Sequence, residues 1–304
     1  MSNYQHITKF QRIISLSEES IHSEYELNFN LQVSFNIDLI LNPILDVKKD
    51  ALAFQQPKCP NNLQMNHGEY INKNGNGIQN VIKELKAKHT SNRAIISLIN
   101  QNDIVGSGDN PIPSFMILQF SIENSNELYV TTYFRALEVS KFLRINIEEI
   151  RMIIQQIQEE IIDITKVNLN IIAFRAYIKK DINPLKRAKL DLLSQIKILG
   201  LLRKHKDKKE LLSLLEEKKA SSTIIEYNSF EMILECLNDE DSETDINSDI
   251  NQPLIKSKFE ELIKISKELK DLRTKSSHSP QINEKQEIYI TLIDEIIREI
   301  RHDS

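Results

Sequence analysis

The chain has 304 residues, with 39 Lys and Arg against 44 Asp and Glu, a formal net charge of −5. Hydrophobic residues make up 40% and charged residues 27%, which excludes a disordered, collagen-like or disulfide-stapled protein. Only six residues are Gly, so a Gly-rich nucleotide loop is nearly excluded. Two cysteines, Cys59 and Cys236, form neither a metal quartet nor a disulfide framework, which indicates a reducing compartment.

The N-terminal twenty residues carry scattered charge and lack the apolar stretch of a signal peptide. No run of about 18 apolar residues occurs in the sequence, so no membrane-spanning helix is expected. We therefore expect a cytoplasmic protein without a membrane partner. Its length allows one large domain or two ordinary ones.

The first predicted element is a long half-buried strand, or two strands joined by a bulge. Apolar residues alternate with mostly polar ones from Leu27 to Leu41. Residues 48–77, rich in Gly, Asn and Pro, predict a loop. A helix starting at Ile78 and a short strand over 93–99 follow.

Residues 115–123 and 127–135 predict a β-hairpin, joined by Asn-Ser-Asn. A short helix over about 136–143 precedes a longer one, in which isoleucines recur every three or four residues. Asn146 has the pattern of an N-cap for this longer helix, because Glu follows three residues later. A last strand is predicted over 168–178.

The composition changes near residue 180. Residues 179–219 contain 13 Lys or Arg against six Asp or Glu and predict helices throughout, with Pro184 in a first turn. Residues 226–251 contain nine acidic residues and no basic one. The stretch 238–253 within this region predicts a flexible acidic linker.

Two amphipathic helices follow the linker, over 254–272 and about 284–301. Two helices alone bury little, so their apolar stripes predict a protein interface, with packing on each other or on the rest of the chain as the alternative. The stripes comprise Ile255, Phe259, Leu262 and Leu269, then Ile288, Leu292, Ile296 and Ile300.

The predicted fold class is α+β, a mixed sheet with packed helices followed by an all-α C-terminal region. Four parts are expected along the chain. They are an α+β domain over 1–180, a basic helical extension over 181–237, the linker over 238–253 and a helical hairpin over 254–304.

Motif searches find no HExxH, GxSxG, P-loop or paired CxxC. The seven His are scattered, so no metal site is predicted. The order of segments between residues 77 and 178 is more informative. These segments are GIQNVIKELKAKHTSNRAIISLIN, PSFMILQF, LYVTTYFRALEV, FLRINIEEI and IIAFRAYI.

In this order and spacing the five segments resemble the thymidylate synthase and dCMP hydroxymethylase family, over about 100 of the 304 residues. The first resembles a helix, a serine/arginine turn and a strand ending in Asn. The second stands where the family has Pro-Cys-His and a later Gln-Phe pair. The last three resemble its strand ending in Arg-Ser, its Phe-Asn helix start and its His-x-Tyr strand.

The resemblance implies a thymidylate-synthase-like fold and assigns roles by position. In the family a Cys thiolate attacks C6 of dUMP, and Ser114 takes that position here. A serine hydroxyl without an adjacent base is a poor nucleophile, and Phe115 replaces the usual His. Ser114 is therefore expected to be catalytically inactive.

Several other positions imply nucleotide binding. Arg135 matches the arginine that grips the nucleotide phosphate, and Arg93 matches one of a pair that reaches the partner subunit's phosphate. The residues that match contacts to base and ribose are Gln119, Asn146 and Tyr177. Glu138 stands where the family has Asp in its folate site, and Arg175 replaces a family His.

Each position also has a structural alternative. Asn146 could be only a helix cap, and Arg135 could end its strand in a surface ion pair. Gln119 and Tyr177 could be buried, hydrogen-bonded structural residues. Arg175 could add positive charge to the pocket or pair with an acid.

The departures from the family indicate lost chemistry. The chain has no Arg-Thr-Gly-Thr-like phosphate loop, no Trp and no folate-closing tail. We therefore expect an inactive, pyrimidine-nucleotide-binding or scaffold protein without a cofactor. Its expected partners are a nucleoside monophosphate, a second copy bound through the α+β domain, and a protein bound by the C-terminal helices.

Two alternatives remain open. One is a divergent pyrimidine C5 methyl- or hydroxymethyltransferase, which would use methylene-tetrahydrofolate and take its thiolate from Cys59 or Cys236. The other is a nucleic-acid-binding protein that uses the basic helices 179–219, although the acidic linker could neutralise them.

Overall fold

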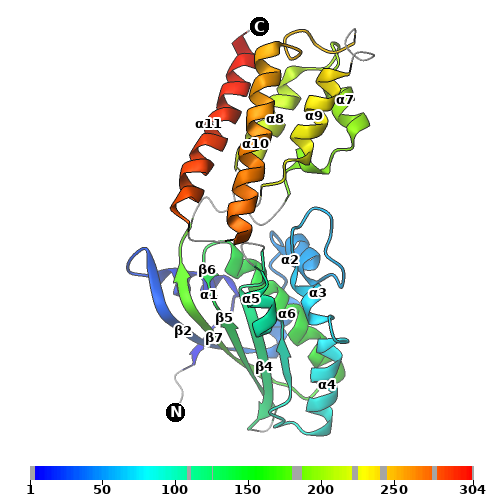
Figure 1. The fold of residues 1–304 in the computed structure, drawn as a ribbon. Coiled ribbons are helices and arrows are strands. Elements are labelled where there is room, and N and C mark those ends of the chain that lie inside the picture. The colour runs from blue at the N-terminus through cyan, green and yellow to red at the C-terminus, as the bar shows by residue number, and fades with distance from the viewer. Residues whose placement is uncertain are drawn as a thin grey trace. The chain divides into compact units, whose positions relative to one another are not determined.

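The computed structural model describes residues 4–107, 111–124, 126–179, 187–220, 225–239, 245–275 and 279–302 (Figure 1). They divide into two compact units. The first contains most residues up to about 180 and combines a mixed sheet with helices. The second contains most later residues and is built from helices. The predicted α+β class with an all-α C-terminal region is confirmed.

The sheet of the first unit has the strand order β1-β2-β7-β5-β4-β3, with β6 also paired to β7. Neighbours pair antiparallel except β1 with β2, β5 with β7 and β6 with β7, which pair parallel. The strands are β1 Gln5–His6, β2 Tyr25–Asn36, β3 Ile95–Ser97, β4 Phe115–Glu123, β5 Glu127–Phe134, β6 Leu137–Glu138 and β7 Lys166–Tyr177.

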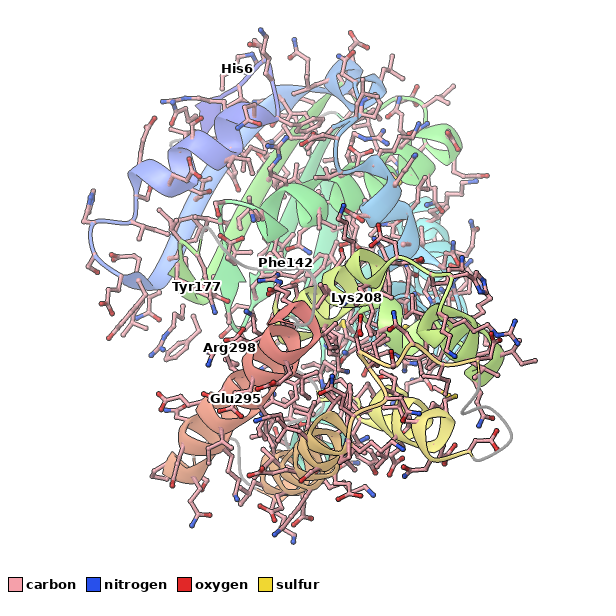
Figure 2. All side chains as sticks on the ribbon, turned by 90° about the horizontal axis from the view of Figure 1, so that it is seen from above. His6, Phe142, Tyr177, Lys208, Glu295 and Arg298 are labelled. Carbon is pink, nitrogen blue, oxygen red and sulfur yellow. The ribbon has the colours of Figure 1, made fainter. Side chains whose placement is uncertain are left out.

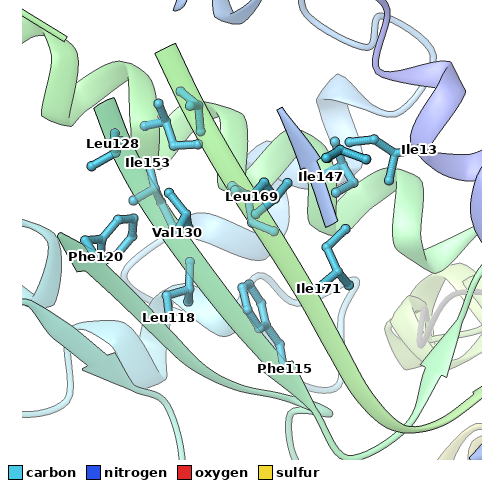
Figure 3. Close-up of a cluster of buried hydrophobic side chains, with 14 of the residues drawn as sticks. Ile13, Phe115, Leu118, Phe120, Leu128, Val130, Ile147, Ile153, Leu169 and Ile171 are labelled. Atoms are coloured by element: carbon cyan, nitrogen blue, oxygen red, sulfur yellow. The ribbon is translucent and has the colours of Figure 1, made fainter. Parts of the chain in front are cut away.

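Helices pack on one face of this sheet, where an apolar core forms. On β4, Leu118 and Phe120 face the core and are buried, whereas Gln119 between them is exposed. Figure 3 shows side chains of β4, β5, β7, α1 and α6 gathered in this core. The helical segments are α1 Gln11–Glu19, the 3-10 helix η1 Ile37–Leu41, α2 Lys48–Gln55, α3 His67–Ile71, α4 Gly77–Ala87, α5 Gln101–Val105 and α6 Phe142–Glu160.

The hairpin of β4 and β5 and the helix α4 lie where the sequence predicts them. Asn124 and Asn126 at the hairpin turn have positive φ, a conformation that Asn tolerates. The strand predicted to reach Leu41 ends at Asn36, because residues 37–41 turn into a 3-10 helix. The strand predicted over 93–99 shortens to β3.

Two predictions in the first unit are wrong. Residues 48–77 contain α2 and α3 rather than only loop, because Asn66 caps α3 and α2 packs on α6. The helix predicted over 136–143 is replaced by β6, which pairs with β7, and by the start of α6.

The second unit packs its helices around one hydrophobic core. Its elements are the 3-10 helix η2 Lys189–Leu192, α7 Gln195–Leu202, α8 Lys208–Ala220, α9 Asn228–Asn238, α10 Pro253–Lys275 and α11 Pro280–His302. Each of these helices contributes buried apolar side chains to this core. Pro184 lies outside the described residues.

The observed division differs from the four expected parts. Ile246 and Ile250 of the expected linker are buried in the core of the second unit. The apolar stripes of α10 and α11 are buried there as well, apart from Ile288. The basic extension, the described part of the linker and the C-terminal hairpin therefore form one unit rather than three parts.

Acidic residues of the linker also pair with the basic segment of the same unit. Asp245 contacts Arg203 at 2.9 Å and Asp249 contacts Lys208 at 2.7 Å. These pairs compensate part of the positive charge between residues 179 and 219 within one unit. None of the helices in the described ranges is long and apolar enough to cross a membrane.

Candidate functional site

Arg135 lies directly after β5, beside the segment that leads into β4. Its backbone N–H donates to the Ser114 carbonyl at 3.0 Å. Its Nε donates to the Pro113 carbonyl at 3.3 Å, and its Nη2 donates to the Ile112 carbonyl at 3.1 Å. Main-chain carbonyl oxygens thus hold the guanidinium in place. Because these carbonyls carry no net charge, they do not neutralise its positive charge.

No carboxylate among the described residues forms an ion pair with Arg135. Partial burial lowers the pKa of its guanidinium, since water solvates the charge less well there. The alternative that Arg135 serves a surface ion pair therefore has no support in the described part of the chain. A fixed guanidinium without a counterion is suited to bind an anion.

Tyr177 and Glu138 lie near Arg135. Glu138 belongs to β6, which follows Arg135 closely in the chain, and β6 pairs with the end of β7 that carries Tyr177. Glu138 is the register partner of Tyr177 (labelled in Figure 2). Burial raises the pKa of the Tyr177 phenol, the negative charge of Glu138 raises it further, and Arg135 opposes the shift. Tyr177 is thus within electrostatic reach of both charges.

The Glu138 carboxylate caps the N-terminus of α6. It is 3% exposed and accepts the backbone N–H groups of Ser140, Lys141 and Phe142 at 3.0, 2.7 and 2.9 Å. It also accepts the N–H of Lys179 at 3.2 Å. A carboxylate suits this place, because the first N–H groups of a helix lack partners and carry partial positive charge. The carboxylate oxygens of Glu138 are thus bonded to the backbone, and this geometry does not support the folate role that the resemblance implies.

Asn146 is not the N-cap of a helix, because α6 begins four residues earlier, at Phe142. Its side chain is 5% exposed and donates to Glu149 Oε2 at 3.2 Å. The N-cap pattern misled because Glu138, from the neighbouring strand, supplies the cap instead. Asn146 lies in the interior with its amide already bonded.

The interior around Asn146 holds a His-Glu pair that the sequence did not reveal. His67 Nδ1 is 2.9 Å from both carboxylate oxygens of Glu149. Gln55 donates to the Glu149 carbonyl at 2.8 Å. Because Nδ1 is the ring nitrogen next to the Glu149 carboxylate, Nε2 faces away from it.

His67 occupies a closely defined position in α3. Asn66 caps this helix by accepting the Glu69 N–H at 3.3 Å, and it donates to the Gln56 carbonyl at 2.6 Å. A Cβ on Gly68 would lie 2.2 Å from the Gln55 carbonyl oxygen, so only glycine fits there. The Asn66-x-x-Glu69 capping pattern is the sequence signal that could have located this helix.

Phenylalanine rings pack around His67. Phe115, next to Ser114, stacks on Phe134 with ring centroids 4.6 Å apart, and both are buried. The His67 ring contacts Phe115 at 5.6 Å and Phe54 at 5.1 Å. Within the described ranges, the Ser114 hydroxyl has no hydrogen-bond partner, so no base activates it there.

Gln119 and Arg93 lie elsewhere on the first unit. Gln119 is five residues along β4 from Ser114, roughly 16 Å at about 3.3 Å per residue. Its exposed side chain donates to the Asn92 carbonyl at 3.5 Å, beside the turn that carries Arg93. Of the predicted site residues, only Ser114, Arg135, Glu138 and Tyr177 come together within this unit.

Arg175 lies on β7 opposite Leu27 of β2. Its guanidinium carbon is 4.4 Å from the centre of the Tyr25 ring, a cation–π contact. Stacking uses the face of the guanidinium and leaves its N–H edge free for other partners.

Comparison with known proteins finds no matching family model and no matching curated protein. Among solved structures, the chain is similar to thymidylate synthase from T4 phage, with 15% sequence identity and a TM-score of 0.43. The similarity covers 57% of this chain and 77% of that one. At this identity and TM-score it assigns no activity, ligand or partner.

The two thiols, Cys59 and Cys236, belong to different units. Cys236 belongs to α9 of the second unit, and burial, together with nearby carboxylates, raises the pKa of its thiol. Cys59 lies in the loop after α2, where its Sγ contacts the Pro60 carbonyl. In the ranges that the structure covers, no group of three or more His, Cys, Asp or Glu could hold a metal ion.

Proposed function

We propose that the first unit binds a nucleoside monophosphate without transferring a methyl group to it. The observation that carries the proposal is Arg135, whose guanidinium is anchored by two carbonyls and has no carboxylate partner among the described residues. A phosphate monoester matches the fork of N–H donors that a guanidinium presents. Tyr177, beside it, offers a phenol to the sugar or base.

The same geometry argues against methyl transfer. Ser114 has no base in the described part of the chain, and Phe115 and Phe134 fill the adjacent interior. Asn146 is bonded to Glu149 rather than presented to a ligand. Binding needs only the exposed groups around Arg135, whereas covalent chemistry needs an activated nucleophile.

We further propose that the functional form is a homodimer that pairs through the first unit. Gln119 and the aliphatic side chain of Ile95 are exposed on the sheet, and Arg93 is exposed in the turn before β3. A partner subunit packed there would cover Ile95, and the family resemblance implies that Arg93 would then reach the other copy's phosphate. Light scattering tests the dimer, and a monomeric mass at micromolar concentration would contradict it.

Calorimetry with dUMP, dCMP, dTMP and unphosphorylated deoxyuridine tests the nucleotide site. We expect at least one monophosphate to bind, with affinity reduced about tenfold or more for deoxyuridine and for Arg135→Gln, because a hydrogen-bonded charge pair contributes about 1.5–3 kcal/mol. Arg12→Gln, which removes an exposed pair with Glu19, is the matched control. A folded protein that binds none of these nucleotides would refute the proposal.

Tritium release from 5-tritiated dUMP or dCMP with methylene-tetrahydrofolate tests the catalytic alternative. We expect no release, because the described chain provides no activated nucleophile at Ser114. Release above background, with a thymidylate synthase as positive control, would show that catalysis has survived.

A further inference from the structure

The surface of the second unit carries a groove between α9 and α10. Its volume is about 590 Å³. Leu234 and Ile263 contribute its apolar lining, and Glu231, Glu235, Glu260 and Lys267 are among its charged residues. The apolar stripes that predicted a partner surface are buried in the unit's own core, so this groove is a different surface.

The groove is negatively charged. Lys267 is 2.6 Å from Glu231, and these two charges compensate each other. Among the residues that the structure describes, Glu235 accepts one hydrogen bond, from Gln195 at 3.4 Å. Within the described ranges, neither Glu235 nor Glu260 has a Lys or Arg in ion-pair distance, so their charges are free to meet a cationic partner.

An exposed aliphatic side chain follows the α7 residue that contacts the acidic lining. Gln195, which contacts Glu235, begins α7, and the next residue, Ile196, is 83% exposed. A partner bound at Glu235 therefore has an exposed apolar side chain one residue away from the Gln195 contact.

We propose that this groove binds a Lys- or Arg-rich amphipathic helix of another protein. Such a helix would pack its apolar face on Leu234 and Ile263 and direct its cations toward Glu235 and Glu260. The α9 residues that line the groove extend from Glu231 to Asn238, roughly 10 Å at about 1.5 Å per residue, which matches two turns of a bound helix.

The chain's own basic stretch is a poorer occupant. Residues 203–207, between α7 and α8, are not helical, and Arg203 is already paired with Asp245. A second copy inserting this loop would have to break that pair. The acidic lining of the groove and the non-helical form of this loop therefore favour a separate, helical partner.

Fluorescence anisotropy with the full chain tests this proposal. The probes are a labelled 14-residue peptide of Leu and Lys with helical apolar periodicity, and the same pattern with Glu in place of Lys. We expect saturable binding of the Lys peptide that weakens with salt, a gain of helicity in its circular dichroism, and at least tenfold weaker binding of the Glu peptide.

Variants locate the binding surface. We expect the double change Glu235→Lys/Glu260→Lys to weaken binding of the Lys peptide about tenfold. The separate change Ile196→Ser should weaken this binding about threefold. Glu287→Lys, an exposed charge reversal on α11, is the matched control and should have no effect. Thermal melts would establish that each variant is folded.

Three outcomes would overturn the proposal. They are no saturable binding of the Lys peptide, an equal loss of affinity in the Glu287→Lys control, and a concentration-dependent mass that Glu235→Lys/Glu260→Lys abolishes. The last result would assign the groove to a second copy of this chain. The nucleotide calorimetry is independent, because its site lies in the first unit.

Discussion

At Glu138, a carboxylate that the family resemblance places in a folate site instead accepts four backbone N–H groups. Its neighbours Arg135 and Tyr177 keep exposed or partly exposed polar groups. The same short segment therefore holds a structural carboxylate and the arginine that we propose binds an anion. Residue type did not separate these roles, because both need a charged side chain at the end of a strand.

Glu138→Gln tests the capping role. An amide at this position would direct N–H groups at backbone donors, so we expect the free energy of unfolding to fall by about 1.5–3 kcal/mol, the range for hydrogen bonds to a charged group. Urea denaturation measures the change. Glu159→Gln, at an exposed position on the same helix, should change stability by less than about 0.5 kcal/mol. An equal effect in both variants would contradict the cap.

Tyr289 of the second unit is fully buried. Among the described residues, its hydroxyl has no hydrogen-bond partner. Burial raises the pKa of this phenol far above 10.0, and the nearby Asp191 carboxylate raises it further. The folded state therefore holds the Tyr289 proton more tightly than the unfolded state does.

Tyr289→Phe should leave stability at pH 7 unchanged within about 0.5 kcal/mol, because no hydrogen bond is lost. The raised pKa contributes stability that is complete below pH 10 and is lost as the pH rises, since only the unfolded phenol ionises there. At pH 11 the variant should therefore be more stable than the wild type by about 1 kcal/mol. Urea denaturation at both pH values measures this, and a loss above about 1 kcal/mol at pH 7 would reveal a partner for the hydroxyl.

At the scale of elements, α3 and α6 are fixed by contacts with distant parts of the chain. His67 of α3 meets Glu149 of α6, 82 residues later. Glu148 of α6 accepts two bonds from Arg151 and the N–H of Ile44 at 2.9 Å each. Because these partners satisfy its charged side chains, α6 can bury them at positions between its isoleucines, where the sequence pattern predicts a polar, exposed face.

Two glycines provide a matched test of how closely α3 approaches α2. Gly68→Ala would place a Cβ 2.2 Å from a backbone oxygen, so we expect destabilisation by about 1–3 kcal/mol from overpacking. Gly200→Ala in α7 meets no atom within 4 Å and should stabilise the chain by about 0.5–1 kcal/mol. Thermal unfolding measures both, and a neutral Gly68→Ala would contradict the close approach.

For the whole molecule, the C-terminal helices belong to the core of the second unit rather than to an appended hairpin. Ending the chain after Leu237 removes α10 and α11 and exposes the residues that pack against them, such as Phe230 and Leu215. We expect aggregation and a loss of helical circular dichroism greater than the deleted residues account for. A monomeric, well-folded truncated chain would contradict this packing.

The amino-acid sequence by itself determined the elements whose signals are local. The β4–β5 hairpin, α4, α10, α11 and the body of α6 follow from apolar periods and turn residues within each segment. The α+β class with an all-α end follows from the same periods. The low Gly content likewise excluded a Gly-rich loop without any structure.

Only the tertiary structure decided which polar residues meet. It moved the start of α6 to Phe142, buried Asn146 with Glu149 and His67, and separated Gln119 and Arg93 from Arg135. It also drew Ile246 and Ile250 of an acidic linker into a core. The reason is physical: a cap, a buried carboxylate or a counterion depends on groups brought close by folding, and these are distant in the sequence.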